Sequence, residues 1–247
     1  MHDLVMCWSE TASWAMVAVG GAMTVHTARR GDPVPVPVTF GYFTVMEALQ
    51  GAGYRVVDAC GSPTNEVITY LSILHIVFQP IVINAFAMEL VGRPVGTAMR
   101  TVVFSLCALA STVMLLQLHP FEWAGSCRPG TVLCGAQLCT ISGDWHIAWE
   151  VPRNGLMDGL GDAIGMQAGF PTYMLAAFGL PLLYGAWRFV IFHALAGPML
   201  ASQLTGNPNE MPAIWCLFSI GLVLVALSPW IRARVVAPGG WQRAGPA

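Results

Sequence analysis

The chain has 247 residues, of which 55% are hydrophobic and 10% are charged, and its formal net charge is −2. Soluble domains carry about 25% charged residues, so this composition predicts a membrane protein with several crossings. The weak negative charge gives no electrostatic basis for binding nucleic acid, and the absence of Lys excludes a Schiff base to retinal or pyridoxal phosphate.

The N-terminus does not resemble a cleaved signal peptide, because it contains no cationic region and because Asp3 and Glu10 interrupt the apolar run. We therefore predict a retained first helix at about 4–27. Met6 is an alternative start, which would leave Cys7 almost at the terminus as a possible free thiol.

Two helices joined by a short turn are predicted next. The helix at about 38–57 is less apolar than the others and suits burial among its neighbours. The helix at about 65–91 is long enough to cross a bilayer, which takes about 20 residues, yet it contains His75, Gln79 and Asn84. Polar groups at that depth are costly unless they face protein or water, so these side chains are predicted to face the inside of a bundle.

A fourth helix at about 99–118 leads into the longest connection, 119–169, whose Gly, Pro, Cys and Trp content predicts an ordered cap. The apolar stretch 170–203 is too long for one crossing and has Arg188 near its centre, so we predict that it forms two helices. The remaining predicted helices lie at about 170–186, 189–204 and 213–230.

Arginine distribution predicts the topology. With seven helices and the N-terminus outside, eight of the 11 arginines fall on the cytoplasmic side, as the positive-inside rule requires. These eight are Arg29, Arg30, Arg93, Arg100, Arg188, Arg232, Arg234 and Arg243. The sequence thus predicts an all-α, seven-transmembrane-helix bundle in a bacterial inner membrane, with residues 1–247 forming one transmembrane domain. The C-terminus is then cytoplasmic, and the cap between the fourth and fifth helices is extracytoplasmic.

A polar pocket is predicted inside this bundle. Glu47 and His75 each lie about ten residues into neighbouring helices, which at 1.5 Å per residue places both near the bilayer mid-plane. Gln79 lies one turn from His75, and Glu10 lies in the outer part of the first helix. We expect these four residues to form a pocket that opens outward and binds a small ligand or ion. The alternative is a buried hydrogen-bonded network that only fixes how the helices pack.

A second histidine could supply a cofactor site. His193 and His75 could together ligate haem or a metal, since bis-imidazole ligation needs two histidines on facing helices. The predicted depths differ, because His193 lies about four residues into its helix and His75 lies nearer the centre. A cofactor between them would be tilted, and the alternative is a His193 that snorkels or is hydrogen-bonded.

Four cysteines are predicted to lie outside the membrane: Cys60, Cys127, Cys134 and Cys139. An oxidising compartment favours two disulfides that fasten the cap to the turn between the second and third helices, although four cysteines allow three pairings. The rival is a metal site formed by Cys134, Cys139 and His146, whose spacing lacks a second close pair. Cys107 and Cys216 fall within helices and are predicted to be small core residues.

The cap contains a segment with a four-residue spacing. Trp145 and Trp149 are four residues apart, as are His146 and Glu150. On a short helix this spacing produces an aromatic face beside a polar one. The favoured interpretation is an aromatic anchor at headgroup level. The alternative is a lid over the pocket, in which Trp145 and His146 contact the ligand.

Several segments of the chain resemble an uncharacterised family of bacterial polytopic membrane proteins. They are residues 6–10 (MCWSE), 43–50 (FTVMEALQ), 74–80 (LHIVFQP), 145–149 (WHIAW) and 207–212 (NPNEMP). The resemblance covers most of the chain and implies a multi-helix membrane fold with no assigned activity. The seven-helix layout with its N-terminus outside is similar to that of rhodopsins and seven-helix receptors in arrangement alone.

Three functional hypotheses follow. The first is an integral membrane protein that binds a small ligand or ion in a sensory, carrier or accessory role. The second is a membrane-embedded metal- or haem-dependent redox protein or hydrolase that uses His75. The third is a structural subunit that binds a membrane-protein partner in a larger complex. Whether the protein is an enzyme stays open, and the internal repeats and paired broken helices of many transporters are not evident.

Overall fold

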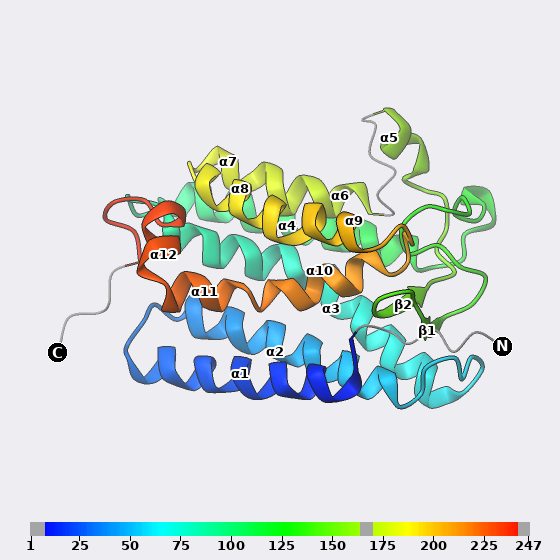
Figure 1. Ribbon diagram of the computed structural model, residues 1–247. Coiled ribbons are helices and arrows are strands. Elements are labelled where there is room, and N and C mark those ends of the chain that lie inside the picture. Colours follow the sequence, from blue (N-terminus) through cyan, green and yellow to red (C-terminus); the bar gives the residue numbers. More distant parts are fainter. Residues whose placement is uncertain (1–7, 164–169, 242–247) are drawn as a thin grey trace.

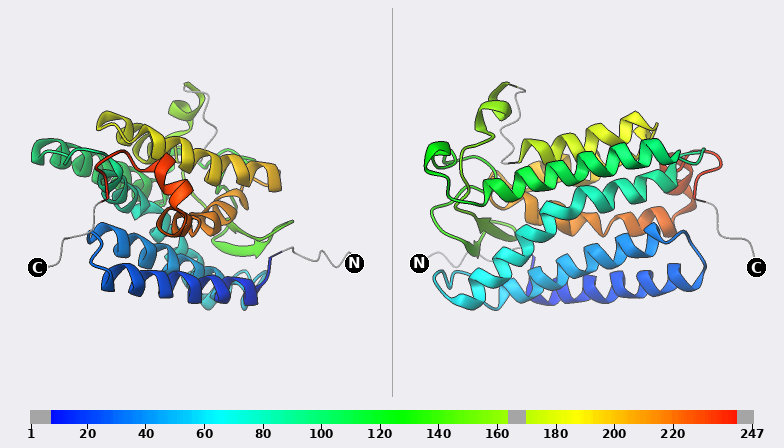
Figure 2. Two further views of the ribbon diagram at one scale, coloured as in Figure 1. Left: turned by 60° about the vertical axis from the view of Figure 1, so that its left-hand side comes forward. Right: turned by 180° about the vertical axis from the view of Figure 1, so that it is seen from behind.

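A computed structural model describes residues 8–163 and 170–241. Its helices lie side by side, and a small cap that contains a β-hairpin covers one end of them (Figures 1 and 2). The first four helices are α1 (Glu10–Arg29), α2 (Pro35–Tyr54), α3 (Pro63–Leu90) and α4 (Thr97–Gln117). The cap contains η1 (Glu122–Ala124), β1 (Cys139–Ser142), β2 (Ile147–Glu150) and α5 (Asp158–Ala163).

The second half of the chain forms shorter helical pieces. The first run is α6 (Pro171–Met174), η2 (Leu175–Gly179) and α7 (Leu180–Leu183), and the second is α8 (Trp187–Ala194), η3 (Leu195–Met199) and α9 (Leu200–Leu204). The last run is α10 (Met211–Ser219), α11 (Leu222–Leu227) and α12 (Pro229–Val235). The chain turns between α7 and α8 at Gly185, whose φ of 87° favours glycine, and this is where the sequence predicts a break.

The predicted last helix, 213–230, is broken. α11 and α12 meet at an angle of 102°, so the chain bends sharply at the end of the apolar segment. Ser228 has an extended backbone, its hydroxyl accepts a hydrogen bond from the Ile231 amide (3.3 Å), and Pro229 begins α12. A Ser cap followed by Pro is a strong start signal for a new helix, which explains the bend.

Among the described residues two helices, α3 and α4, are long and apolar enough to cross a membrane, and the bent run from α10 to α12 would be a third if it forms one span. The most apolar part of α3 is 67% buried inside the protein, whereas that of α4 is 28% buried. α3 is therefore the central helix and α4 a peripheral one. The finding is compatible with a membrane protein, and the seven crossings stay a prediction.

Disulfide bonding of the cap is confirmed. Cys60–Cys139 joins the turn after α2 to β1 across 79 residues, whereas Cys127–Cys134 closes a short loop inside the cap. Only the first of them fastens the cap to the turn as predicted. The rival metal site is excluded in this state, because Cys134 and Cys139 are bonded to sulfur and have no thiolate to bind a metal. Cys7 lies outside the described residues.

The segment around Trp145, predicted as a short helix, is β-structure instead. β1 and β2 pair antiparallel with Thr140 opposite Trp149. The Thr140 amide donates to Asn65 Oδ1 (2.9 Å), and Asn65 Nδ2 donates to the Thr140 carbonyl (2.9 Å). The side chain of Asn65 on α3 therefore extends the hydrogen bonding of the hairpin, and this long-range contact outweighs the local spacing.

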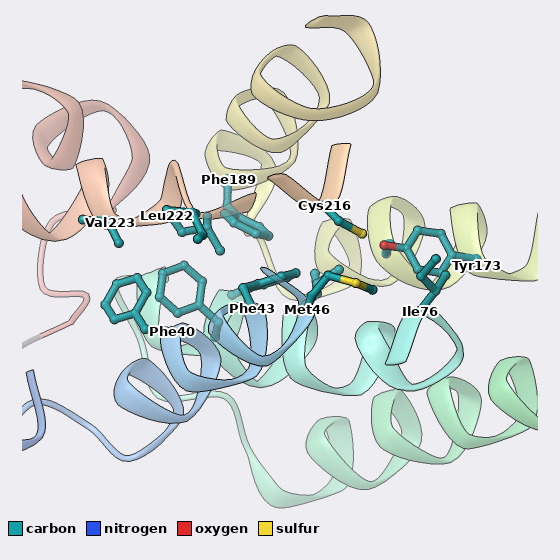
Figure 3. Packing of buried hydrophobic residues seen from close by; sticks show 14 of the residues in the cluster. Phe40, Phe43, Met46, Ile76, Tyr173, Phe189, Cys216, Leu222 and Val223 are labelled. Atoms are coloured by element: carbon teal, nitrogen blue, oxygen red, sulfur yellow. The ribbon is translucent and has the colours of Figure 1, made fainter. Parts of the chain in front are cut away.

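The main hydrophobic core lies where α2 faces α3, α8, α10 and α11. Figure 3 shows Phe43 and Met46 of α2 pointing toward Phe189 and Cys216, and Phe40 lying below Leu222 and Val223. Polar side chains of α2, α3 and α10 lie within this apolar region, and they form the candidate site described next.

Candidate functional site

Glu210, in the loop before α10, is a fully buried carboxylate that holds the hairpin to the helices. It accepts hydrogen bonds from the backbone amides of Trp145 (2.6 Å), Asp144 (3.2 Å) and His146, and from the hydroxyl of Thr205. Backbone N–H groups satisfy a buried carboxylate without a cation. Glu210 therefore positions the turn of the hairpin over the end of α10.

His146 is fully buried beneath that turn and connects the cap to α2. Its Nδ1 lies 2.5 Å from the Tyr54 hydroxyl, and its Nε2 lies 3.0 Å from Gln50 Oε1. Gln50 in turn donates to the carbonyl of Ala213 on α10 (2.9 Å). Burial lowers the pKa of His146 to about 3, because an imidazolium ion would lose its hydration there. The histidine is thus a neutral link between the cap and α2.

This link makes the stability of the cap depend on pH. In the unfolded chain His146 has a pKa near 6.5, so below that pH the unfolded state binds a proton at His146 that the folded state does not bind. Stability should fall by roughly 1.4 kcal/mol for each pH unit between about 6.5 and the folded pKa near 3. Denaturant midpoints at pH 7 and pH 5, followed by tryptophan fluorescence, test this. The variant His146→Gln should show a flatter pH dependence, and an unchanged dependence would contradict the assignment.

The two tryptophans of the hairpin do not form an exposed aromatic face. Trp149 is fully buried in the core, whereas Trp145 is partly buried and stacks on Trp8, with ring centroids 5.7 Å apart. The Trp8 amide also donates to the Trp145 carbonyl (3.0 Å). Trp149 is therefore not the predicted headgroup anchor, because its side chain lies in the core.

A cavity of about 120 Å³ lies below the cap between α3, α6, η3 and α10. The cap contributes Val132 and Leu133 to its lining, and α3 contributes Ile76 and Gln79. The remaining lining residues are Phe170, Tyr173, Met174, Pro198, Met211, Pro212, Trp215 and Cys216. The lining is almost entirely apolar, so the few polar atoms that reach the cavity determine its chemistry.

Those polar atoms belong to Gln79, Tyr173 and Cys216. The Tyr173 hydroxyl donates to Gln79 Oε1 (2.6 Å), and Gln79 Nε2 donates to the thiol sulfur of Cys216 (3.4 Å). Figure 3 shows the Cys216 sulfur and the Tyr173 hydroxyl pointing toward one another. An amide, a phenol and a thiol thus meet at one side of an apolar cavity, where they could orient a single polar group of a ligand.

Glu47 lies behind this group and makes no hydrogen bond of its own. It is fully buried, and within the described part of the chain neither of its carboxyl oxygens has a hydrogen-bond partner. It lies close enough to Cys216 to interact electrostatically. A carboxyl group without partners is costly to bury in an apolar interior, so Glu47 lowers the stability of this region unless a partner reaches it.

His75 does not share a pocket with Glu47. Its Nε2 lies 2.7 Å from the carbonyl oxygen of Tyr42, and the Tyr42 hydroxyl donates to the His75 carbonyl (2.5 Å). The two rings are 3.7 Å apart between centroids. This reciprocal pair of hydrogen bonds fixes α2 against α3. It matches the alternative interpretation of His75, in which a buried hydrogen-bonded network only fixes how the helices pack.

Glu10 also lies away from the cavity. Its carboxylate accepts hydrogen bonds from Arg55 Nε (2.6 Å) and Trp14 Nε1 (3.1 Å) at the surface of the helix ends. Of the four residues predicted to form one pocket, Gln79 lines the cavity, whereas Glu10, Glu47 and His75 do not.

His193 packs in an aromatic cluster of its own. Its ring stacks on Phe178 (4.8 Å) and Phe189 (5.3 Å), and its Nε2 accepts a hydrogen bond from the Trp215 indole (3.3 Å). It therefore positions Trp215, which lines the cavity. Within residues 8–163 and 170–241 no group of three or more His, Cys, Asp or Glu side chains could hold a metal ion.

Two π-helical turns flank the cavity. η2 follows Tyr173 and Met174 directly, and η3 contains Pro198, which is itself a lining residue. A Cβ at Gly197 would lie 2.4 Å from Trp215 Nε1, so only glycine allows this close approach. π-Helical turns are frequent at functional sites, which adds to the case for this cavity.

Sequence reasoning missed Tyr173, Cys216 and Glu210. Tyr173 lies in an apolar run and Cys216 was predicted to be a core residue, so neither carried a local signal. Glu210 lies between Asn209 and Met211, directly before a helix, where an acid is common because it interacts favourably with the helix N-terminus. The partners of that acid, in the hairpin, were beyond any local pattern.

Searches among curated proteins and among solved structures found no significant match to the chain. A family model matches residues 11–236, which cover most of the helices, the cap and the cavity described above. The protein belongs to a family of unknown function, DUF5765.

Proposed function

We propose that this protein crosses a bacterial inner membrane several times with its cap outside, and that the cavity below the cap binds a small, mostly apolar ligand. The observation that carries the ligand proposal is the apolar cavity of about 120 Å³ with the Gln79–Tyr173 pair in its wall. An apolar protein cavity of about 150 Å³ takes up benzene, so the bound group is about the size of a small ring.

Exposed apolar side chains support the membrane assignment. On α4 the residues Val102, Leu106, Leu109 and Leu116 are between 40% and 59% exposed and recur at helical spacing. Such a stripe would be costly in water, but it is the usual surface of a helix that faces lipid. Similar exposed side chains occur on α3, α7, α8 and α11.

The arginines and exposed tryptophans support the orientation. The end of α1, the α3–α4 connection, the α7–α8 turn and α12 lie at the end opposite the cap (Figure 1), and they carry Arg29, Arg30, Arg93, Arg100, Arg188, Arg232 and Arg234. At that end the guanidinium of Arg188 lies 5.4 Å from the Trp187 ring, and that of Arg234 lies 3.5 Å from the Trp230 ring. Arginines favour the cytoplasmic face and tryptophans favour both interfaces, so this end suits the cytoplasmic side.

The ligand proposal predicts selective binding of a ring that carries a hydroxyl group. In a titration of the detergent-purified protein followed by fluorine NMR, 4-fluorophenol should bind more tightly than fluorobenzene. One hydrogen bond contributes about 0.5–1.5 kcal/mol, so the preference should be roughly 2- to 12-fold. The double variant Gln79→Leu and Tyr173→Phe should lose most of this preference, because the cavity then offers neither the amide nor the phenol and keeps only the weakly polar Cys216 thiol.

A matched control exists on the same helices. The Tyr184 hydroxyl donates to Asn84 Oδ1 (2.8 Å), a second tyrosine–amide pair between α3 and the end of α7, and neither residue lines the cavity. The variant Tyr184→Phe should keep the preference for 4-fluorophenol. If neither probe shows saturable binding to the wild type, the cavity is not a ligand site.

A further inference from the structure

We propose that the Cys127–Cys134 disulfide is a site of thiol–disulfide exchange with a dithiol protein, and that its reduction opens the cavity below. The cap has a second hollow, an open cleft of about 890 Å³, and both of these cysteines line it. Cys134 is the more exposed of the two, since Cys127 is 6% exposed. The inference rests on the proposed function only in one respect, namely that the cavity opened by reduction is the proposed ligand site.

The loop closed by this disulfide forms the roof of the cavity. Val132 and Leu133 line the cavity, while Cys127 and Cys134 line the cleft on the other side. Leu133 is 1% exposed and has a φ of 56°, in the left-handed region that costs a leucine about 1–2 kcal/mol. The loop is therefore held in a conformation that its own residues do not favour.

Hydrogen bonds also hold the ends of this loop, among them those from the amides of Cys127 and Gly135 to the carbonyls of Arg153 and Val151 (both 3.0 Å). Asn209 bonds both backbone groups of Cys134: its Oδ1 accepts from the amide (3.1 Å), and its Nδ2 donates to the carbonyl (3.0 Å). Near the other end, Arg153 Nη2 donates to the Thr131 hydroxyl (2.6 Å). These hydrogen bonds are weaker than a covalent bond, so we expect loss of the disulfide to let the segment from Cys127 to Cys134, with Val132 and Leu133, move away from the cavity.

The exchange reaction balances with a protein dithiol as the reductant. A thiolate of the partner attacks the Sγ of Cys134, the Cys127–Cys134 bond breaks, and Cys127 leaves as a thiolate that takes up a proton. The second thiol of the partner then attacks the mixed disulfide and releases Cys134 as a thiol. In total the cap disulfide gains two electrons and two protons, and the partner is oxidised to its own disulfide.

The other disulfide lies outside the cleft. Cys139 is 0% exposed, and Cys60, although partly exposed, does not line the cleft in which the partner would bind. Because attack requires access to a sulfur atom, the same dithiol should leave Cys60–Cys139 intact.

Cys216 provides a native reporter, because its thiol lines the cavity below the roof, whereas Cys107 is buried in a separate cluster of α3, α4 and α6–η2. The full chain in detergent is treated with a reduced thioredoxin-type protein and then with N-ethylmaleimide, and labelling is followed by peptide mass spectrometry. We expect Cys216 to be alkylated at least about tenfold faster after reduction, with Cys107 unchanged and Cys60–Cys139 still oxidised. The double variant Cys127→Ser and Cys134→Ser should show the fast rate without any reductant.

Two results would overturn the inference. One is a failure of the dithiol protein to reduce Cys127–Cys134, and the other is reduction without faster labelling of Cys216. Equal acceleration at Cys107 would also overturn it, because that would indicate general unfolding rather than opening of the roof. Labelling measures only whether Cys216 is accessible. If reduction speeds the labelling of Cys216 but the protein binds neither fluorinated probe, the proposed ligand is rejected and the exchange site is retained.

Discussion

Replacement of Glu210 by Gln should release the hairpin from the end of α10 and destabilise the protein by roughly 3–5 kcal/mol. The carboxylate accepts hydrogen bonds from the amides of Trp145, Asp144 and His146 and from the Thr205 hydroxyl. An amide of the same size offers one acceptor oxygen, and its NH₂ group faces N–H donors. Each hydrogen bond to a charged acceptor contributes about 1.5–3 kcal/mol, so losing two of them accounts for the effect.

Thermal unfolding in detergent, followed by the fluorescence of the buried Trp149, measures this change. Glu122→Gln is the matched control, since Glu122 is an exposed carboxylate of the same cap and its replacement should leave the midpoint within experimental error. A Glu210→Gln variant as stable as the control would show that the carboxylate is not what holds the hairpin.

Removal of the Cys60–Cys139 disulfide should have an effect of similar size. This bond closes a loop of 79 residues, and in the chain-entropy description its loss costs about 4.5 kcal/mol. The Cys127–Cys134 bond spans seven residues, so the same description predicts a cost of about 2 kcal/mol. The pair Cys60→Ser and Cys139→Ser should therefore lower the unfolding midpoint about twice as far as the pair Cys127→Ser and Cys134→Ser.

This difference also separates two roles for the disulfides. A large loss at Cys60–Cys139 is expected of a bond that fastens the cap to the turn after α2. A small loss at Cys127–Cys134 is expected of a bond that can be opened and closed while the cap stays folded. The reverse order of midpoints would contradict both the attachment of the cap by Cys60–Cys139 and the exchange chemistry proposed for the short loop.

Part of the site could be predicted from the sequence. Gln79 was identified because a polar residue deep in an apolar helix is costly unless it faces the interior, and it does line the cavity. The same reasoning grouped it with His75 and Glu47, which are buried as expected but bond elsewhere or not at all. Depth along a helix does not specify the direction of a side chain around it, so residues at one level can face different neighbours.

The sequence by itself determined that the protein is helical, apolar and asymmetric in its arginines, and it favoured disulfides in the cap over a metal site. Each of those properties depends on the hydropathy, length or charge of one segment, so it can be recognised without knowing how the segments pack. Only the tertiary structure decided which polar groups meet: Tyr173 lies 94 residues from Gln79, and Cys216 lies 137 residues from it. It also decided that the WHIAW segment forms the turn and second strand of a hairpin, since hydrogen bonds from hairpin amides to Asn65 and Glu210 stabilise the hairpin more than local spacing stabilises a helix.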